Sequence, residues 1–297
     1  MNNLIKYFLC AVMVTGSCWL TGCSNDEPEQ ISGTEENPGD NENPGDNENP
    51  GDNENDDLPP ITYSSFEVEG IYYDVLTDKT VSVAPVPEEI RKTNKYKGDI
   101  NIPSTVKYEG RIFTVERIGR IAFCNSLITS VVIPPTVTVI ESFAFWICEK
   151  LGEVVFSEGL KEIQEFAFDA CRALSEINLP DSLETLGIES FANCDKLKKV
   201  TLGQNLKLIE GGAFYSDYKL ETIICNATFV PKCIPDNSWE GFPNPPLSNP
   251  EPIWIYTFVV YNKAILYVPD KKLHLYKIAE TWKNFENIQP ISALNNI

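Results

Sequence analysis

An apolar pattern that repeats every 23 residues constrains the fold of this chain more than any other feature. Four phenylalanines mark its register: Phe145, Phe168, Phe191 and Phe214. Aliphatic residues keep fixed positions before and after each of them, and an earlier unit around Phe123 fits with one residue deleted. Because a unit of this size cannot bury its apolar face alone, the units must stack and share one core. The sequence therefore predicts a repeat solenoid.

Each unit has room for little regular structure. Ile177 and Leu179 alternate with polar residues, which is typical of a short strand, and Pro180 ends it. Stacked units would align these strands in a parallel sheet. The segment from Ile163 to Cys171 is too short for a long helix, so we expect a short strand or turn there, followed by a loose helical turn at the Ala-Phe pair.

The repeat pattern reads Ile-x-x-x-Ala-Phe-x-x-Cys-x-x-Leu-x-x-Ile-x-Leu-Pro over about residues 100–225. It resembles the BspA-like leucine-rich repeat family, also called Treponema-type. The resemblance implies a mainly β, right-handed leucine-rich repeat stack with parallel strands. It also implies an N-terminal β cap and a C-terminal cap made of β structure and a short helix.

Residues 58–112 are the expected N-terminal β cap, and residues 113–225 are the repeats. Phe66 to Val83 is interpreted as two strands, with breaks at Gly70 and at residues 77–79. Residues 102–115 resemble the hairpin that precedes the repeats in the family, and Glu109-Gly110 supplies its turn.

Residues 226–297 are the expected C-terminal part. Between residues 226 and 262 the chain is rich in proline and aromatic residues, including Trp239 and Trp254. Such a segment either packs on the end of the solenoid or serves as a binding loop. Residues 264–269 and 276–288 then resemble the strand and short helix that end members of the family.

Residues 1–22 have the pattern of a bacterial lipoprotein signal peptide. One lysine precedes a short apolar run, and Leu20-Thr21-Gly22 leads to Cys23, the residue that would receive lipid. An ordinary secretory signal is the alternative. The acidic residues after Cys23 resemble the surface-export signal of Bacteroidota lipoproteins. We therefore expect a lipid anchor on Cys23 in the bacterial outer membrane, with the protein facing the exterior.

Residues 23–57 form the expected tether between the lipid and the domain. Within residues 24–57 there are 13 acidic residues and no Lys or Arg, and Glu-Asn-Pro-Gly-Asp-Asn recurs from Glu36, Glu42 and Glu48. A segment with so few apolar side chains cannot offset its ordering entropy, so the sequence predicts a disordered spacer.

The charge of the chain excludes some partners. The formal net charge is −19, which disfavours binding to nucleic acid, where a basic face must neutralise phosphates. The single histidine, His274, excludes most histidine-based catalysis and metal sites. The sequence contains no nucleophile elbow, P-loop or dinucleotide loop. We therefore predict no enzyme activity and no cofactor.

The cysteines fall into two groups. Cys148, Cys171 and Cys194 share one repeat phase, which predicts buried structural thiols rather than a metal site, and Asp217 takes the fourth position. Cys225 and Cys233 lie eight residues apart beside an irregular segment. A disulfide between them is one alternative in an oxidising compartment, and separate thiols are the other.

The residues between the core positions of each strand should form columns on one exposed face. These residues are Thr129, Ser130 and Val132; Gly152, Glu153 and Val155; Ser175, Glu176 and Asn178; Lys198, Lys199 and Thr201; and Glu221, Thr222 and Ile224. Repeat solenoids use such faces for extended recognition, although a plain solvated face is equally compatible. We select Asn178, Lys198, Lys199 and Thr201, together with Trp239 and Trp254, as candidate ligand-binding residues.

Two functions fit these features. The resemblance implies a surface lipoprotein whose repeats recognise a protein of the host matrix or of another cell, in the manner of an adhesin. The alternative is a structural or assembly component of the bacterial envelope. The predicted strand face carries no aromatic residue of the kind that binds carbohydrate, which favours a protein ligand.

Overall fold

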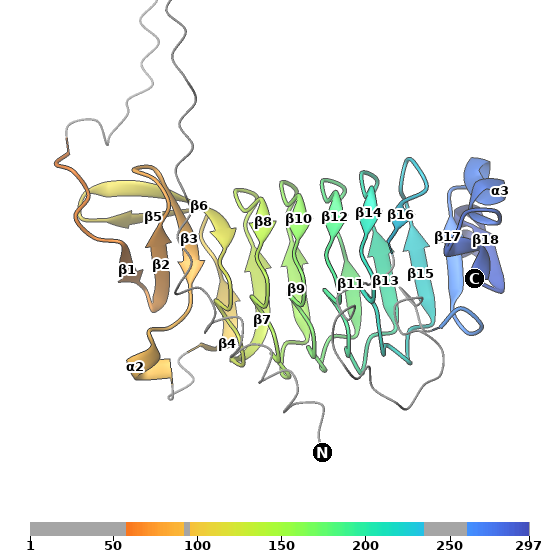
Figure 1. Cartoon of the computed structure of the whole chain (residues 1–297), viewed down its shortest axis with the longest axis horizontal. Helices are drawn as coiled ribbons and strands as arrows, with labels where there is room; N and C mark the ends of the chain where they lie inside the picture. Colours follow the sequence, from red (N-terminus) through yellow and green to blue (C-terminus); the bar gives the residue numbers. More distant parts are fainter. Residues whose placement is uncertain (1–57, 92–95, 235–259, 297) are drawn as a thin grey trace, which may run out of the picture. The chain divides into compact units, whose positions relative to one another are not determined.

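The computed structural model describes residues 58–91, 96–234 and 260–296, and these described residues belong to one compact unit. Within it the repeats wind into successive coils, each of which contributes a longer strand and a two-residue strand (Figure 1). The longer strands are β4 (Lys97–Asn101), β7 (Leu127–Ile133), β9 (Glu153–Phe156), β11 (Glu176–Asn178), β13 (Lys199–Leu202), β15 (Thr222–Cys225), β17 (Ile265–Val268) and β18 (Asn287–Pro290). The short strands are β8 (Val139–Ile140), β10 (Glu162–Ile163), β12 (Thr185–Leu186), β14 (Leu208–Ile209) and β16 (Lys232–Cys233).

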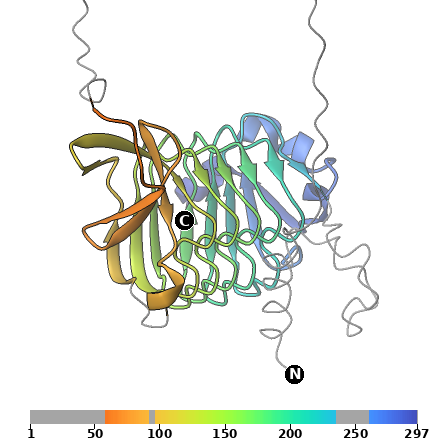
Figure 2. The ribbon, with the colours of Figure 1, turned by 60° about the vertical axis from the view of Figure 1, so that its left-hand side comes forward.

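The strands pair in parallel between successive coils. Glu162 in β10 lies opposite Thr185 in β12, and Thr185 lies opposite Leu208 in β14. Each step is 23 residues, so the spacing in the sequence equals the length of one coil. The predicted repeat fold with parallel strands is therefore confirmed, and the same succession of coils is visible from another side in Figure 2.

The phenylalanine positions form the centre of the core. The rings of Phe145, Phe168 and Phe191 are fully buried and stacked, with centroids 4.7 and 4.9 Å apart. Phe123 and Phe214 continue the stack at either end. Identical side chains at equivalent positions of successive coils place the rings face to face. The 23-residue register therefore explains this stack of phenylalanine rings, the phenylalanine spine.

The cysteines of the repeats are buried structural thiols, as predicted. Cys148, Cys171 and Cys194 have no exposed surface, and the Cys171 thiol donates to the carbonyl oxygen of Phe145 at 3.3 Å. Burial raises the pKa of Cys148 to about 12, which keeps its thiol protonated at neutral pH.

The Ala-Phe segment forms a tight turn instead of the expected helical turn. Two positions of this turn have positive φ in each coil, for example Phe143 (61°) and Ile147 (58°), and Phe166 and Ala170 in the next coil. Alternate N–H groups donate out of the turn, so that Phe145 donates to the carbonyl oxygen of Ala167 at 2.7 Å. A helical turn does not form, because every second N–H group donates to the neighbouring coil and not within its own turn.

Residues before the repeats form antiparallel strands. The segment interpreted as two strands contains three: β1 (Ser65–Val68), β2 (Ile71–Val75) and β3 (Thr80–Ala84). The expected hairpin forms from β5 (Thr105–Tyr108) and β6 (Arg111–Ile118). Both Glu-Gly turns, at residues 69–70 and 109–110, have positive φ at the two residues, which suits a two-residue hairpin turn.

These strands join the coils through β6. Strand β3 pairs with β6 in parallel, and β6 pairs with β8, so one ten-stranded sheet runs from the hairpins into the repeats. A short helix, α2 (Glu88–Arg91), follows β3.

The end of the chain adds two further parallel strands, β17 and β18, to the longer-strand sheet. Between them lie η2 (Asp270–Lys272), α3 (Leu273–Tyr276) and η3 (Trp282–Asn284), and η4 (Ile291–Asn296) follows. Tyr276 and Trp282 are fully buried, and the Trp282 indole N–H donates to the carbonyl oxygen of Pro231 at 2.8 Å. No helix in the described ranges is long and apolar enough to cross a membrane.

The close approach of successive coils predicts that Gly203 tolerates no side chain. A Cβ atom there would lie 2.1 Å from the carbonyl oxygen of Pro180 in the previous coil. We expect Gly203→Ala to lower the free energy of unfolding by about 1–3 kcal/mol, because backbone must move to relieve the clash. Denaturant unfolding followed by circular dichroism measures the effect.

Gly152→Ala is the matched control, since its Cβ would meet no atom closer than 3.9 Å. A change within about 0.5 kcal/mol is expected there. Equal effects of the two substitutions would contradict the proposed packing.

Candidate functional site

The exposed face of the longer strands carries the predicted columns. Asn178 lies opposite Thr201, and Thr201 lies opposite Ile224. The register extends the same column to Tyr267 in β17 and Gln289 in β18. Tyr267 is buried, so it adds no exposed aromatic ring to the face.

The hydrogen-bonded pairing of the longer strands is interrupted between β9 and β11. Strands β4, β7 and β9 form one sheet, whereas β11, β13, β15, β17 and β18 form another. The side chains therefore fall into two groups. Val132 and Val155 are neighbours in the first sheet and are 37% and 44% exposed, and Asn178, Lys199 and Thr201 lie in the second.

The two candidate lysines have different surroundings. The Lys199 ammonium contacts the Glu176 carboxylate of the previous coil at 2.7 Å, and Asn178 donates to the same oxygen at 3.3 Å. The bond from Lys199 is the main reason why the pKa of Glu176 lies below its usual value, and the bond from Asn178 adds to this effect. Lys198 is exposed and forms no ion pair with any residue the structure describes. Of the two candidate lysines, Lys198 therefore carries the uncompensated positive charge.

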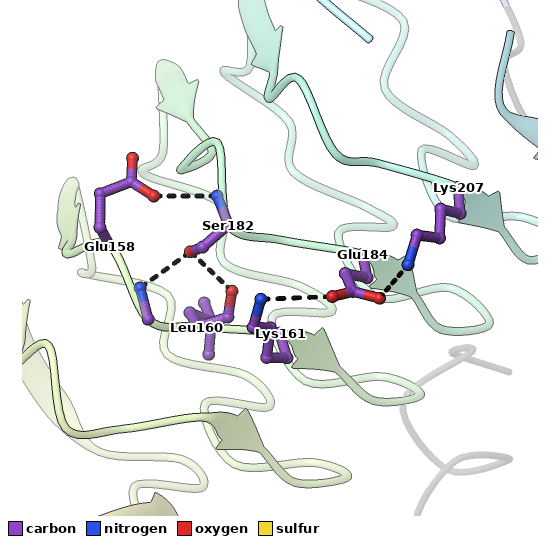
Figure 3. Close-up of polar contacts among 7 residues, drawn as sticks. Glu158, Leu160, Lys161, Ser182, Glu184 and Lys207 are labelled. Atoms are coloured by element: carbon purple, nitrogen blue, oxygen red, sulfur yellow. Dashed lines mark hydrogen bonds and ion pairs between the residues drawn. The ribbon is translucent and has the colours of Figure 1, made fainter. Parts of the chain in front are cut away.

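A second set of charges lines the turns that follow the longer strands. Glu184 contacts both Lys161 and Lys207, from the coils on either side of its own (Figure 3). In the same row, the Glu158 carboxylate accepts the backbone N–H groups of Asp181 and Ser182. Because these groups bind one another between coils, this edge is satisfied internally and is a weaker candidate for ligand recognition.

Three acidic side chains, Asp169, Glu189 and Asp217, are buried inside the coils, and burial raises the pKa of Asp169 and of Asp217. Asp169 accepts hydrogen bonds from the Trp146 indole at 3.0 Å and from the Asn193 amide at 2.7 Å. Burial raises the pKa of Asp169 to about 6, and these two bonds oppose the increase. Sequence analysis did not select this triplet, although the spacings of 23 and 24 residues place its members in adjacent coils.

Asp217 occupies the position of the repeat cysteines. One carboxylate oxygen accepts the backbone N–H of Cys194 at 2.8 Å, and the other oxygen has no hydrogen-bond partner among the described residues. Burial raises the pKa of Asp217 well above its usual value. A protonated carboxyl group therefore suits this site better than a carboxylate.

An open groove of about 690 Å³ lies in the N-terminal part of the domain, between the β1–β2 turn, β4 and β5. Sequence analysis did not identify it, because its walls come from segments that are distant in the sequence. Two exposed lysines, Lys97 and Lys107, line the groove.

The geometry of the coils agrees with a comparison of the sequence with known families. The family described as the BspA type leucine rich repeat region matches residues 116–238 in 6 copies. A leucine-rich repeat protein from Bacteroides capillosus ATCC 29799 is 31% identical, and the match covers 46% of this chain and 97% of that one, with a TM-score of 0.40. The chain belongs to the BspA-type leucine-rich repeat family.

Other solved structures are similar over part of the chain. The T. pallidum leucine-rich repeat protein TpLRR is 26% identical, covering 54% of this chain and 70% of that one, with a TM-score of 0.47. The pneumococcal vaccine antigen PcpA is 24% identical, covering 58% and 46%, with a TM-score of 0.46. Among curated proteins, none matches this chain.

The structure describes four of the candidate ligand-binding residues on the BspA-type repeats and leaves the other candidates untested. Asn178, Lys198, Lys199 and Thr201 lie together on neighbouring strands. Cys23, Trp239 and Trp254 lie outside the described residues, so lipidation and the binding-loop hypothesis remain predictions.

The structure contains Cys225 and Cys233 as separate thiols, and the alternative of a disulfide between them stays a prediction. Cys225 ends β15 in the longer-strand sheet, and its sulfur lies 3.3 Å from the Tyr276 hydroxyl. Cys233 ends β16, which belongs to the sheet of short strands. The two cysteines therefore belong to different walls of the BspA-type coil.

The buried acids predict a pH-dependent stability for the BspA-type domain. A carboxyl group whose pKa is higher in the folded chain retains its proton more strongly there than in the unfolded chain. Stability is then greatest below the unfolded pKa of about 4 and falls as pH rises towards the folded pKa. The stabilising contribution of Asp169 is lost as the pH rises through about 6. The pKa of Asp217 is raised well above its usual value, so its contribution is also lost above the unfolded pKa, as the pH rises towards that raised value.

We expect Asp217→Asn to weaken this dependence. The amide oxygen can still accept the Cys194 N–H, but the side chain no longer ionises. The variant should be more stable than the unsubstituted protein at pH 8 by on the order of 1–3 kcal/mol and should lose this advantage at pH 4. Urea unfolding between pH 4 and pH 8 measures this, with Asp78→Asn on an exposed turn as the control. Parallel pH profiles for the Asp217 variant and the unsubstituted protein would contradict the assignment.

Proposed function

We propose that the chain is a cell-surface lipoprotein whose repeats form a protein-recognition module, in the manner of an adhesin. The observation that carries the proposal is the regular, exposed strand face of a leucine-rich repeat solenoid, since such proteins use extended faces of this kind for binding. We also propose a right-handed coil, with the N-terminal hairpins and the β17–β18 region acting as caps.

The chemistry of the strand face supports a protein partner with both apolar and acidic surface. Val132 and Val155 offer exposed apolar area in the first sheet. Lys198 offers a positive charge in the second, next to the Glu176–Lys199 pair. A mixed apolar and charged face of this kind is typical of protein interfaces.

Charge reversal at Lys198 tests whether the face is used. The partner is first identified by pull-down with the purified protein against matrix proteins, mucins and envelope extracts. Lys198→Glu should then reduce the association rate for an acidic partner by about 3- to 10-fold at low salt, with a smaller effect at high salt. Surface plasmon resonance measures both rates.

Lys277→Glu, which reverses an exposed lysine after α3, is the matched control and should leave association unchanged. If Lys198→Glu and Val155→Asp both leave binding to the identified partner intact, the strand face is not its site. A partner found only in the bacterial envelope would favour the structural or assembly role instead of adhesion.

Lipid anchoring and surface display are tested separately. We expect Cys23→Ala to release the protein from the membrane fraction, because the residue that would carry the lipid is lost. Protease added to intact cells should remove the domain of the unsubstituted protein. A domain that stays protected in intact cells would overturn surface display while leaving lipidation open to the fractionation test.

A further inference from the structure

Two strand edges lie along the N-terminal groove. Strand β4 is the terminal strand of its sheet, and among the described residues only β7 pairs with it. Strand β5 pairs only with β6 within the same part of the chain. Both strands line the groove, together with the turn between β1 and β2. Edges of this kind present backbone N–H and C=O groups to which another extended chain can bind.

Two buried tyrosines form part of the wall of the groove. Tyr73 and Tyr96 line it and are almost fully buried. The Tyr96 hydroxyl accepts the backbone N–H of Tyr72 at 3.0 Å and donates to the carbonyl oxygen of Ala84 at 3.2 Å. These bonds tie the start of β4 to both β2 and β3. A groove with a preformed wall loses little entropy when a ligand enters it.

Two exposed lysines of the groove offer contacts for acidic side chains of a ligand. Lys97 and Lys107 are exposed and form no ion pair with any described residue. The Asp99 carboxylate is already bound by the hydroxyl groups of Thr129 and Ser130, at 2.6 and 2.7 Å. Glu69, on the β1–β2 turn, and Asp99 are the acidic residues of the lining, and the two hydroxyl bonds hold Asp99 against β7 and lower its pKa, so it stays ionised. Two ammonium groups are therefore available to carboxylates of a bound segment.

We propose that this groove binds an extended acidic segment of a partner protein, which adds a strand to the free edge of β4 and places acidic side chains against Lys97 and Lys107. The backbone hydrogen bonds supply affinity, and the two lysines supply the preference for acidic residues. This site lies at the β4 edge of the first sheet, next to the strand face, and does not depend on the function proposed for that face.

Synthetic peptides test both parts of the proposal. The probe is a fluorescent, end-blocked Val-Glu-Val-Glu-Val-Glu peptide, and its binding to the full chain is followed by anisotropy. Two further peptides carry N-methyl groups on alternate residues, one set on the Val residues and the other on the Glu residues. Because a strand directs alternate N–H groups to opposite edges, one methylated peptide should bind at least tenfold more weakly and the other should retain affinity.

The lysine variants test the charge preference. Lys97→Gln combined with Lys107→Gln should weaken binding of the probe at least threefold, and the two Lys→Glu changes should weaken it more. A Val-Lys peptide of the same length should not bind. Lys198→Glu, on the strand face, is the matched control and should leave probe binding unchanged, whatever its effect on the partner of the strand face. Thermal melting confirms that each variant is folded.

Several outcomes would overturn the proposal. One is the absence of binding at about 1 mM peptide, the limit of a weak interaction. Another is equal affinity of both methylated peptides and the unmodified probe, which excludes strand addition. Equal binding of the Val-Lys peptide excludes the acidic preference. If deletion of residues 24–51 raises probe affinity tenfold or more, the chain's own acidic segment occupies the groove. Concentration-dependent dimers that the probe dissociates would identify a second copy as the occupant.

Discussion

Backbone hydrogen bonds between successive coils are the interaction on which the rest of the structure depends. They form along the strands, as between β10 and β12, and also through the turns, where Phe145 donates to Ala167 and Phe168 donates to Ser190. Each coil thereby fixes the position of every equivalent residue in the next coil. The stacked rings, buried thiols and exposed columns all follow from that alignment, because equivalent side chains are brought to one coil spacing from each other.

The same alignment explains where polar residues are tolerated. On the surface, opposite charges in adjacent coils form pairs such as Glu176–Lys199 and Glu184–Lys207. Inside, the alignment places Asp217 where the preceding coils have cysteine, and the site retains a carboxyl group with a raised pKa. Residues that depart from the repeat therefore differ in their consequences: an outward position gains an ion pair, whereas an inward one carries a desolvation cost.

Much of the fold could be predicted from the sequence, because a strict period converts sequence distance into spatial distance. The phenylalanine spine, the buried cysteines and the columns through Asn178 and Thr201 follow from the spacing alone. The helical turn at the Ala-Phe pair was predicted wrongly, since local propensity does not reveal that alternate N–H groups donate to another coil. The candidate site was predicted only as a face, with Lys198 and Lys199 treated alike.

The sequence by itself determined the coil length, the identity of the core positions and which side chains share a face, since these depend only on the 23-residue register. The tertiary structure alone decided which of those side chains are free to bind. Lys199 is occupied by Glu176, whereas Lys198 is not. It also decided where the hydrogen-bonded pairing of the longer strands is interrupted, between β9 and β11, and where β1, β2, β4 and β5 leave a groove. The groove depends on distances between non-equivalent segments, and a repeat pattern carries no information about such distances.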